Sequence, residues 1–149
     1  MKDKTIDYVL RSTWQLVTRM YNEEAHKFES TMAMGFTLLS IDPENGSPST
    51  TLGPRMGMEA TSLSRLLKNL EGRGLIYRTP NPDDGRGVII RLTPEGKEKR
   101  DISREVVLRF NDTIRNHVSE SDLKGFYNVA ETIQGLISER KIYQDQNKD

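Results

Sequence analysis

The sequence predicts a mostly α-helical protein with one small β-hairpin, and three observations support this fold class. Apolar residues recur at helical spacing in long stretches near both ends of the chain. A short central stretch, residues 59–72, carries leucines at the i, i+3, i+4 and i+7 positions. Directly after it, two runs of β-branched and aromatic residues flank a loop that is rich in Pro, Asp and Gly.

Length and composition exclude several classes of protein. A chain of 149 residues has room for one domain with a core of ordinary size. It contains no cysteine, which excludes disulfides, thiolate metal sites, a catalytic cysteine and thiol-based redox sensing. No apolar run approaches the ~20 residues of a membrane span, and the N-terminus lacks the apolar region of a signal peptide. We expect a cytoplasmic protein with no membrane partner.

The charge distribution is more informative than the net charge. The formal net charge is zero, which argues against a non-specific nucleic-acid binder. Between Gly53 and Arg91, however, there are seven basic residues and four acidic ones, so the remainder of the chain is acidic. A chain that is basic in its central stretch and acidic elsewhere suits a protein that contacts DNA through one face only.

The first part of the chain predicts three helices. Residues 5–28 have one broad apolar face and form a helix roughly 35 Å long, in which Trp14 is a core or interface anchor. Ser30 and Thr31 can cap a second helix over residues 32–41, and residues 42–49 form a loop. A third, short helix is expected from about Thr50 to Met56. We expect it to tolerate Pro54 because this residue falls near the first turn.

The fourth helix, residues 59–72, has one face for the core and one for a groove. Its leucines face the core, and the opposite face carries short hydroxyls followed by cations: Thr61, Ser62, Ser64, Arg65, Lys68 and Asn69. Such a face suits insertion into a DNA groove, although an isolated helix with this face is more often simply solvated. Three short helices followed at once by a hairpin are the winged helix-turn-helix order, and this context favours the DNA-reading interpretation.

The hairpin is expected to be the wing. Its predicted strands are residues 75–78 and 88–92, with Val88, Ile90 and Leu92 on one face and Ile89 and Arg91 on the other. The loop over residues 80–87 is too long for a two-residue turn.

The wing loop carries one arginine and two neighbouring carboxylates. Arg86 stands between two glycines and is suited to a DNA minor groove. Asp83 and Asp84 lack a pocket, a metal-ligand partner and a neighbouring nucleophile, which disfavours acid–base catalysis. We expect one of them to cap the turn and the other to orient an arginine.

Two long helices follow. Thr93, Pro94 and Glu95 have the N-cap, N1 and first-turn character of a helix start, and that helix is expected to end near Asn116. The stretch from Ser119 to Asp122 starts the last helix, and the polar tail from Tyr143 is expected to fray. The apolar stripes of the terminal helices exceed what a lone winged helix can cover, so we expect a two-fold homodimer.

Two motifs resemble the MarR (multiple antibiotic resistance regulator) family of bacterial winged-helix transcription factors. Residues 84–96, D-G-R-G-V-I-I-R-L-T-P-E-G, are similar to the wing signature of that family. Residues 61–78, T-S-L-S-R-L-L-K-N-L-E-G-R-G-L-I-Y-R, are similar to its recognition helix and first wing strand. The preceding helix, T-T-L-G-P-R-M-G, lacks the usual Ala- and Leu-rich pattern of the family.

The resemblance implies roles for individual residues. Ser62, Ser64 and Arg65 would contact the major groove and Lys68 a phosphate. Arg86 would enter the minor groove, Asp84 would hold an arginine in place, and Arg55 would contact a phosphate. It also implies a single domain over residues 1–149, with a DNA-binding lobe at 31–92 and dimerisation helices at 1–30 and 93–149. Family members usually repress their own or a neighbouring gene, and ligands often bind between these two parts.

The sequence therefore predicts a transcriptional regulator that binds double-stranded DNA. We expect a homodimeric repressor that acts on a pseudo-palindromic operator and is released by a small-molecule effector. The alternative is a winged-helix module for protein contact without DNA binding. An enzyme is disfavoured because the chain has no phosphate loop, no His/Cys/Ser constellation and no metal-ligand cluster, and no cofactor is expected. Glu23, Glu24 and His26 are close enough to suggest metal ligands, but a solvated helix end is the favoured interpretation, so no metal is expected.

Overall fold

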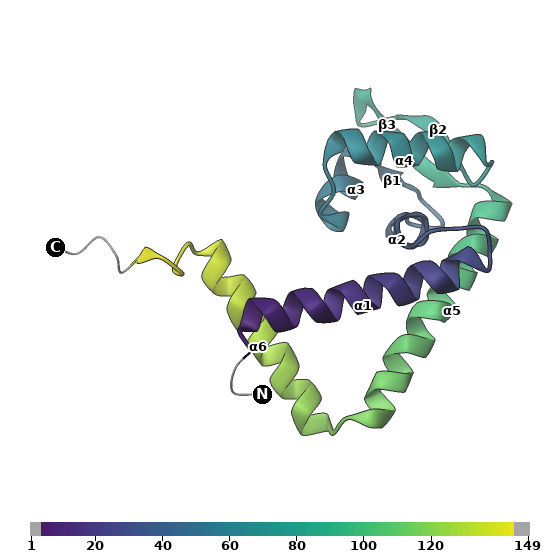
Figure 1. The fold of residues 1–149 in the computed structure, drawn as a ribbon. Helices are drawn as coiled ribbons and strands as arrows, with labels where there is room; N and C mark the ends of the chain where they lie inside the picture. The colour runs from purple at the N-terminus through teal and green to yellow at the C-terminus, as the bar shows by residue number, and fades with distance from the viewer. Residues whose placement is uncertain (1–3, 145–149) are drawn as a thin grey trace. The chain divides into compact units, whose positions relative to one another are not determined.

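A computed structural model describes residues 4–144 of the chain (Figure 1). The chain divides after Val107 into two compact units. The elements of the first unit are α1 (Ile6–His26), α2 (Met32–Ser40), β1 (Ser47–Pro48), α3 (Ser49–Met56), α4 (Ala60–Gly72), β2 (Ile76–Asn81), β3 (Asp84–Leu92) and the first part of α5 (Pro94–His117). The second unit contains the rest of α5 and α6 (Glu120–Ser138). The predicted fold class, mostly α with a winged helix-turn-helix, is confirmed.

The core of the first unit lies inside the predicted winged-helix lobe. It gathers one side of α2, α3 and α4 against the sheet, and its largest fully buried apolar side chains are Leu38, Ile41, Leu52, Leu70, Ile76 and Ile90. The leucine stripe of α4 faces this core as predicted, with Leu63, Leu67 and Leu70 buried and Leu66 packed at the edge. Burial of this stripe fixes the rotation of α4 about its own axis.

The sheet has three antiparallel strands in the order β1-β3-β2. The hairpin register pairs Ile76 with Leu92 and Arg78 with Ile90, while Ser47 of β1 pairs with Ile90 from the other side. The sequence placed residues 42–49 in a loop, so β1 was missed. A two-residue strand that contains a proline carries no alternating pattern and is defined only by its partner.

The hairpin differs from its prediction in two respects. The strands extend well into the predicted loop, and the connection is a two-residue turn at Pro82 and Asp83, because Asn81 pairs with Asp84. A register shift after Pro80 accommodates the surplus length, so residues 85–87 bulge out of the ladder. Ile89 is also buried, although the period of two placed it on the outer face; the loop before β1 covers it, and Gly46 approaches it closely.

Helix α3 begins at Ser49 and ends at Met56, and its C-cap Gly57 adopts the left-handed conformation that glycine accommodates without strain. Pro54 is the sixth residue of this helix, so the expectation that it lies near the first turn was wrong. The proline removes one intrahelical hydrogen bond to the carbonyl of Thr50. Its exposed position late in a short helix keeps that loss local.

A tight junction joins the end of α4 to the start of α5. The Thr93 hydroxyl donates to the carbonyl of Gly74 (2.6 Å), and the Thr93 amide donates to the carbonyl of Leu75 (3.1 Å). Gly96 packs so closely on this carbonyl that a Cβ atom at its position would overlap the Leu75 oxygen. The wing and α5 are therefore anchored to one another through main-chain atoms.

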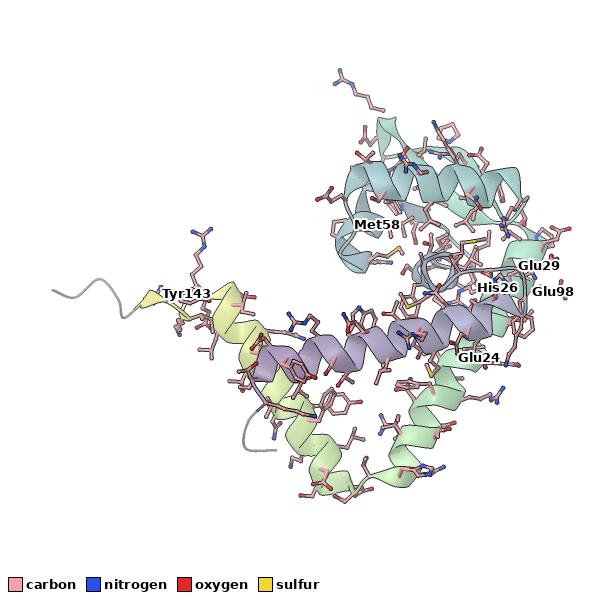
Figure 2. All side chains as sticks on the ribbon, in the orientation of Figure 1. Glu24, His26, Glu29, Met58, Glu98 and Tyr143 are labelled. Atoms are coloured by element: carbon pink, nitrogen blue, oxygen red, sulfur yellow. The ribbon has the colours of Figure 1, made fainter. Side chains whose placement is uncertain are left out.

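The terminal helices follow their predicted boundaries and leave their apolar residues exposed. Thr5 and Ser119 cap α1 and α6 through their hydroxyl oxygens, as the sequence predicted for Ser119. No residue of α6 is buried, and the Trp14 side chain is 54% exposed. Among residues 4–144, no helix is both long and apolar enough to cross a membrane. Tyr143 is 82% exposed (Figure 2), and the rest of the predicted polar tail, from residue 145, lies outside the described residues.

Candidate nucleic-acid interface

The exposed face of α4 carries the side chains that the sequence assigned to a DNA groove. Ser62, Ser64, Arg65 and Lys68 are all exposed, on the side of the helix opposite the buried leucines. The N-cap residue Glu59 makes no side-chain hydrogen bond to the first turn of α4. The helix therefore presents hydroxyls near its N-terminus and two cations further along.

Four of the seven basic residues between Gly53 and Arg91 have partners within the protein. Arg78 Nε pairs with Glu71 Oε2 (2.9 Å), and Arg73 Nη1 donates to the carbonyl of Glu29 (2.6 Å). Arg91 Nε donates to Thr79 Oγ1 (3.0 Å) and its Nη1 donates to the carbonyl of Asn45 (2.9 Å). These bonds hold the guanidinium groups against the lobe and give them structural roles.

Arg55 is the fourth of these partnered residues. Its Nη1 donates to the carbonyl of Ser40, the last residue of α2, over 3.1 Å. This bond caps α2 and ties it to α3. Contact between Arg55 and a DNA phosphate stays a prediction, and the bond to Ser40 gives this arginine a structural role that the sequence did not indicate.

The remaining three basic residues are Arg65, Lys68 and Arg86. Within the described part of the chain, their side chains form no hydrogen bond and no ion pair, and all three are exposed. They are therefore the cations of this stretch that keep their full hydrogen-bonding capacity for an external anion. The resemblance assigned all three to DNA contacts, Arg65 and Arg86 to grooves and Lys68 to a phosphate, together with Arg55.

The side chains of Asp84 and Asn81 hold the main chain of the wing through hydrogen bonds. Asp84 Oδ1 accepts a hydrogen bond from the main-chain amide of Arg86 (3.0 Å), and Asn81 Oδ1 accepts one from the amide of Asp83 (3.0 Å). Within residues 4–144, Asp84 forms no ion pair with an arginine side chain, so it holds the main chain of the wing and not the guanidinium. Arg86 is exposed in the bulge before the regular part of β3.

The hairpin and α4 are arranged as neighbours in the lobe. Strand β2 starts just after the C-terminal end of α4 and runs back along it, so the wing turn lies toward the N-terminal half of the helix (Figure 1). A helix and a hairpin side by side present Arg65 and Lys68 on one element and Arg86 on the other. This is the arrangement by which winged helices address adjacent grooves.

An apolar pocket lies between α1, α2 and the first part of α5. It has a volume of about 40 Å³, is partly open to solvent, and is lined mainly by Tyr21, Ala25, Phe28, Met32, Phe36, Leu39, Ile102, Val106 and Val107. Tyr21 and Phe36 meet edge to face, with centroids 5.6 Å apart. Burial raises the pKa of the Tyr21 phenol above its ordinary value, so this wall of the pocket is uncharged at neutral pH.

Within residues 4–144, no three side chains among His, Asp and Glu gather closely enough to hold a metal ion. Glu24, one of the metal-ligand candidates from the sequence, instead forms an ion pair with Lys27 (2.7 Å). Thr61 and Asn69, which the sequence placed on the same face of this helix without assigning them a contact, are also exposed.

Comparisons with known proteins agree with this geometry. The sequence model of the MarR family matches residues 31–88. The HTH-type transcriptional regulator SarZ of Staphylococcus saprophyticus is 28% identical over 92% of this chain and 93% of its own length. The multiple antibiotic resistance protein MarR of Salmonella typhimurium is 44% identical over 28% of each chain.

Two solved structures share the fold at low identity. MepR of S. aureus in a DNA complex has a TM-score of 0.80 and 22% identity, and the match covers 90% of this chain and all of MepR. The PcaV regulator of Streptomyces coelicolor, in complex with its natural ligand, has a TM-score of 0.75 and 21% identity. That match covers 89% of this chain and 93% of PcaV.

Proposed function

We propose that this chain, whose residues 31–88 match the sequence model of the MarR family, is a transcriptional regulator that binds double-stranded DNA as a homodimer. It acts in the cytoplasm as a repressor on a pseudo-palindromic operator, and a small-molecule effector releases it. Residues 31–92 form the DNA-binding lobe, and residues 1–30 and 93–149 supply the dimerisation helices.

The proposal rests on a difference between the basic residues of the lobe in whether their side chains have partners within the protein. Arg65, Lys68 and Arg86 have no partner in the described chain, while the other cations of this stretch are tied to carbonyl, hydroxyl or carboxylate groups. An exposed arginine on a groove-facing helix can bind guanine through two hydrogen bonds. An arginine in a wing is drawn to the negative potential of a narrow minor groove. Ser62 and Ser64 are short enough to let the α4 main chain approach the bases.

Dimerisation is supported by the apolar surface that one copy leaves exposed. On α1 this surface includes Ile6, Leu10, Trp14 and Leu16, and on α6 it includes Phe126, Val129 and Ile137. Exposed apolar side chains in such number mark a protein interface. A two-fold dimer covers them and sets its two recognition helices about 34 Å apart, which is one turn of DNA.

The apolar pocket is the proposed effector site. Its walls come from α1, α2 and α5, so an occupant contacts both the winged-helix lobe and the proposed dimerisation helices. An occupant that fits one spacing of these helices better than another shifts the protein toward that spacing. The neutral Tyr21 phenol and the aromatic edge of Phe36 suit an apolar or aromatic body.

Selection from a pool of random DNA duplexes at two salt concentrations tests the proposal. The expected result is an enriched sequence with dyad symmetry and half-sites about one helical turn apart. Absence of an enriched half-site would instead support a winged-helix module for protein contact, an alternative with which the zero net charge is consistent.

Variants then assign the roles of individual residues. Arg65→Ala and Arg86→Ala are expected to cost about 1–3 kcal/mol each and to relax specificity at one operator position. Lys68→Ala should weaken all sequences alike and reduce the salt dependence of binding. Arg104→Ala removes an exposed arginine of α5 and serves as the matched control. If Arg86→Ala binds the operator as tightly as the wild type, the wing is not part of the DNA interface.

A further inference from the structure

Asn45 and Gly46 lie in the loop that connects α2 to β1 (Figure 1). Asn45 is exposed and belongs to a turn. An asparagine that precedes a glycine readily loses its side-chain amide group, because the glycine has no side chain to shield the main-chain nitrogen that attacks it. Each of the other asparagines of the chain is followed by a residue that carries a side chain. Asn45 is therefore the asparagine whose sequence context most favours deamidation.

The folded loop restrains this reaction at the Gly46 amide. That nitrogen must lose its proton and attack Asn45 Cγ, but in the fold it donates a hydrogen bond to the carbonyl of Asp42 (3.0 Å). The Asp42 side chain fixes the same turn, since its Oδ1 accepts hydrogen bonds from the amides of Glu44 (2.8 Å) and Asn45 (3.0 Å). The attack therefore requires the loop to open, and the bonds to Asp42 set how often it opens.

We propose that Asn45 is a site of spontaneous deamidation and that the hydrogen bonds to Asp42 set its rate in the folded protein. The Gly46 nitrogen forms a bond to Asn45 Cγ, the bond from Cγ to the side-chain nitrogen breaks, and ammonia leaves with the proton that the Gly46 amide gives up. Water then opens the cyclic imide at either carbonyl. The products are aspartate and isoaspartate, each of which adds a negative charge to the loop.

The isoaspartate product does not fit the native loop. It adds a methylene group to the main chain before Gly46, and the former Asn45 carbonyl becomes a free carboxylate. In the native protein this carbonyl accepts a hydrogen bond from Arg91 Nη1 (2.9 Å). Gly46 has no room to move toward β3, because a Cβ atom at its position would stand 2.7 Å from both Ile89 Cγ2 and the Ile90 carbonyl oxygen. The additional length therefore moves the loop away from β3.

Incubation of the whole folded protein at neutral pH, followed by peptide mapping with mass spectrometry, measures the conversion of each asparagine. Asn45 should convert faster than the other asparagines, but more slowly than in protein unfolded with guanidinium chloride. Asp42→Ala removes both bonds to the carboxylate and should accelerate the conversion about tenfold or more. If Asn45 of the folded wild type converts no faster than the other asparagines, the proposal is overturned. The experiment needs no DNA, so its outcome is independent of the proposed function.

Two control variants separate opening of the loop from unfolding of the lobe. Glu44→Gln removes a neighbouring charge but keeps the main-chain bond to Asp42, and it should leave the rate unchanged. Leu70→Ala lowers stability through a side chain that is fully buried in the core, and it leaves the bonds of Asp42 in place. It should accelerate the conversion less than Asp42→Ala does. Equal acceleration in these two variants would show that the lobe unfolds before Asn45 reacts, which would overturn the role of Asp42.

Comparison of the purified isoaspartate form with Asn45→Asp distinguishes the added methylene from the added charge. The amide NMR signals of Ile89 and Ile90 should shift in the isoaspartate form, because the loop that covers them moves. The same signals should stay close to their wild-type positions in Asn45→Asp, whose main chain is unaltered. Unchanged Ile89 and Ile90 signals in the isoaspartate form would overturn the predicted displacement of the loop.

Discussion

The winged-helix lobe buries its apolar side chains within one chain, whereas the terminal helix α6 leaves its apolar side chains exposed. In the lobe, residues from α2, α3, α4 and the sheet close a core within one chain, and Ile90 at its centre is 0% exposed. In α6 no residue is buried, and Phe126 and Ile137 are each 60% exposed. The lobe is therefore complete as one copy, and α6 is not. In the proposed dimer, the geometry of each recognition helix is therefore set within one chain, while the spacing between the two recognition helices depends on the second chain.

The largest expected effect is at the centre of the lobe. Ile90→Ala should lower the free energy of unfolding by about 2–5 kcal/mol, because it removes buried methyl and methylene groups and leaves a cavity. Ile137→Ala makes the same chemical change on α6 and should cost clearly less in protein dilute enough to be monomeric. Urea denaturation of both variants at one protein concentration measures the difference. Equal losses would mean that α6 is buried within one chain after all.

The second largest expected effect is on the association of two copies of the chain and not on folding. Phe126→Asp places a charge on the exposed apolar face of α6, and the dimer dissociation constant should rise about 100-fold, or about 2.7 kcal/mol. Sedimentation velocity over a concentration series measures this change. NMR signals from buried residues of the lobe should stay in place. A variant that remains a dimer with unchanged affinity would exclude this face of α6 from the interface.

Substitutions of two glycines, one at the junction of the wing with α5 and one on α6, compare the packing of the two regions. Gly96→Ala should destabilise the protein by at least about 1–3 kcal/mol, because the new methyl group overlaps the Leu75 carbonyl at the wing junction. Gly125→Ala in α6 meets no atom within 4 Å and should stabilise its helix by about 0.5–1 kcal/mol. Thermal denaturation of the pair distinguishes the two environments. Loss of stability in Gly125→Ala would show that another chain packs against this position.

The smallest expected effect is a pH dependence in the loop before β1. Hydrogen bonds from the Asn45 and Glu44 amides hold the pKa of the Asp42 carboxyl below its ordinary value. A carboxyl with a lowered pKa stabilises the fold above its unfolded pKa of about 3.9, and this contribution is lost as the pH falls through the folded value. Asp42→Asn should therefore lose less stability than the wild type between pH 5 and pH 3. Urea titrations at both pH values, with Glu44→Gln as control, measure the difference.

Much of the fold was predictable because its signals are local. The sequence placed all six helix starts within a residue or two, and the leucine stripe oriented α4 correctly. The predictions failed where a distant partner decides the structure. Strand β1 exists only through pairing with β3, and Ile89 is buried only because the loop at Gly46 covers it. The wing turn was misjudged because a bulge absorbs the additional residues.

The sequence by itself determined that a basic helix and hairpin stand at the centre of a helical protein, since amphipathic periods and turn residues act over a few positions. It identified seven basic residues there but had no means of ranking them by their partners. The resemblance assigned Arg65, Lys68, Arg86 and Arg55 to DNA contacts, and only the tertiary structure showed that Arg55 differs from the other three by its bond to the carbonyl of Ser40. The partners of Arg73 and Arg91 lie 44 and 46 residues away along the chain, on segments that folding alone brings within hydrogen-bond distance.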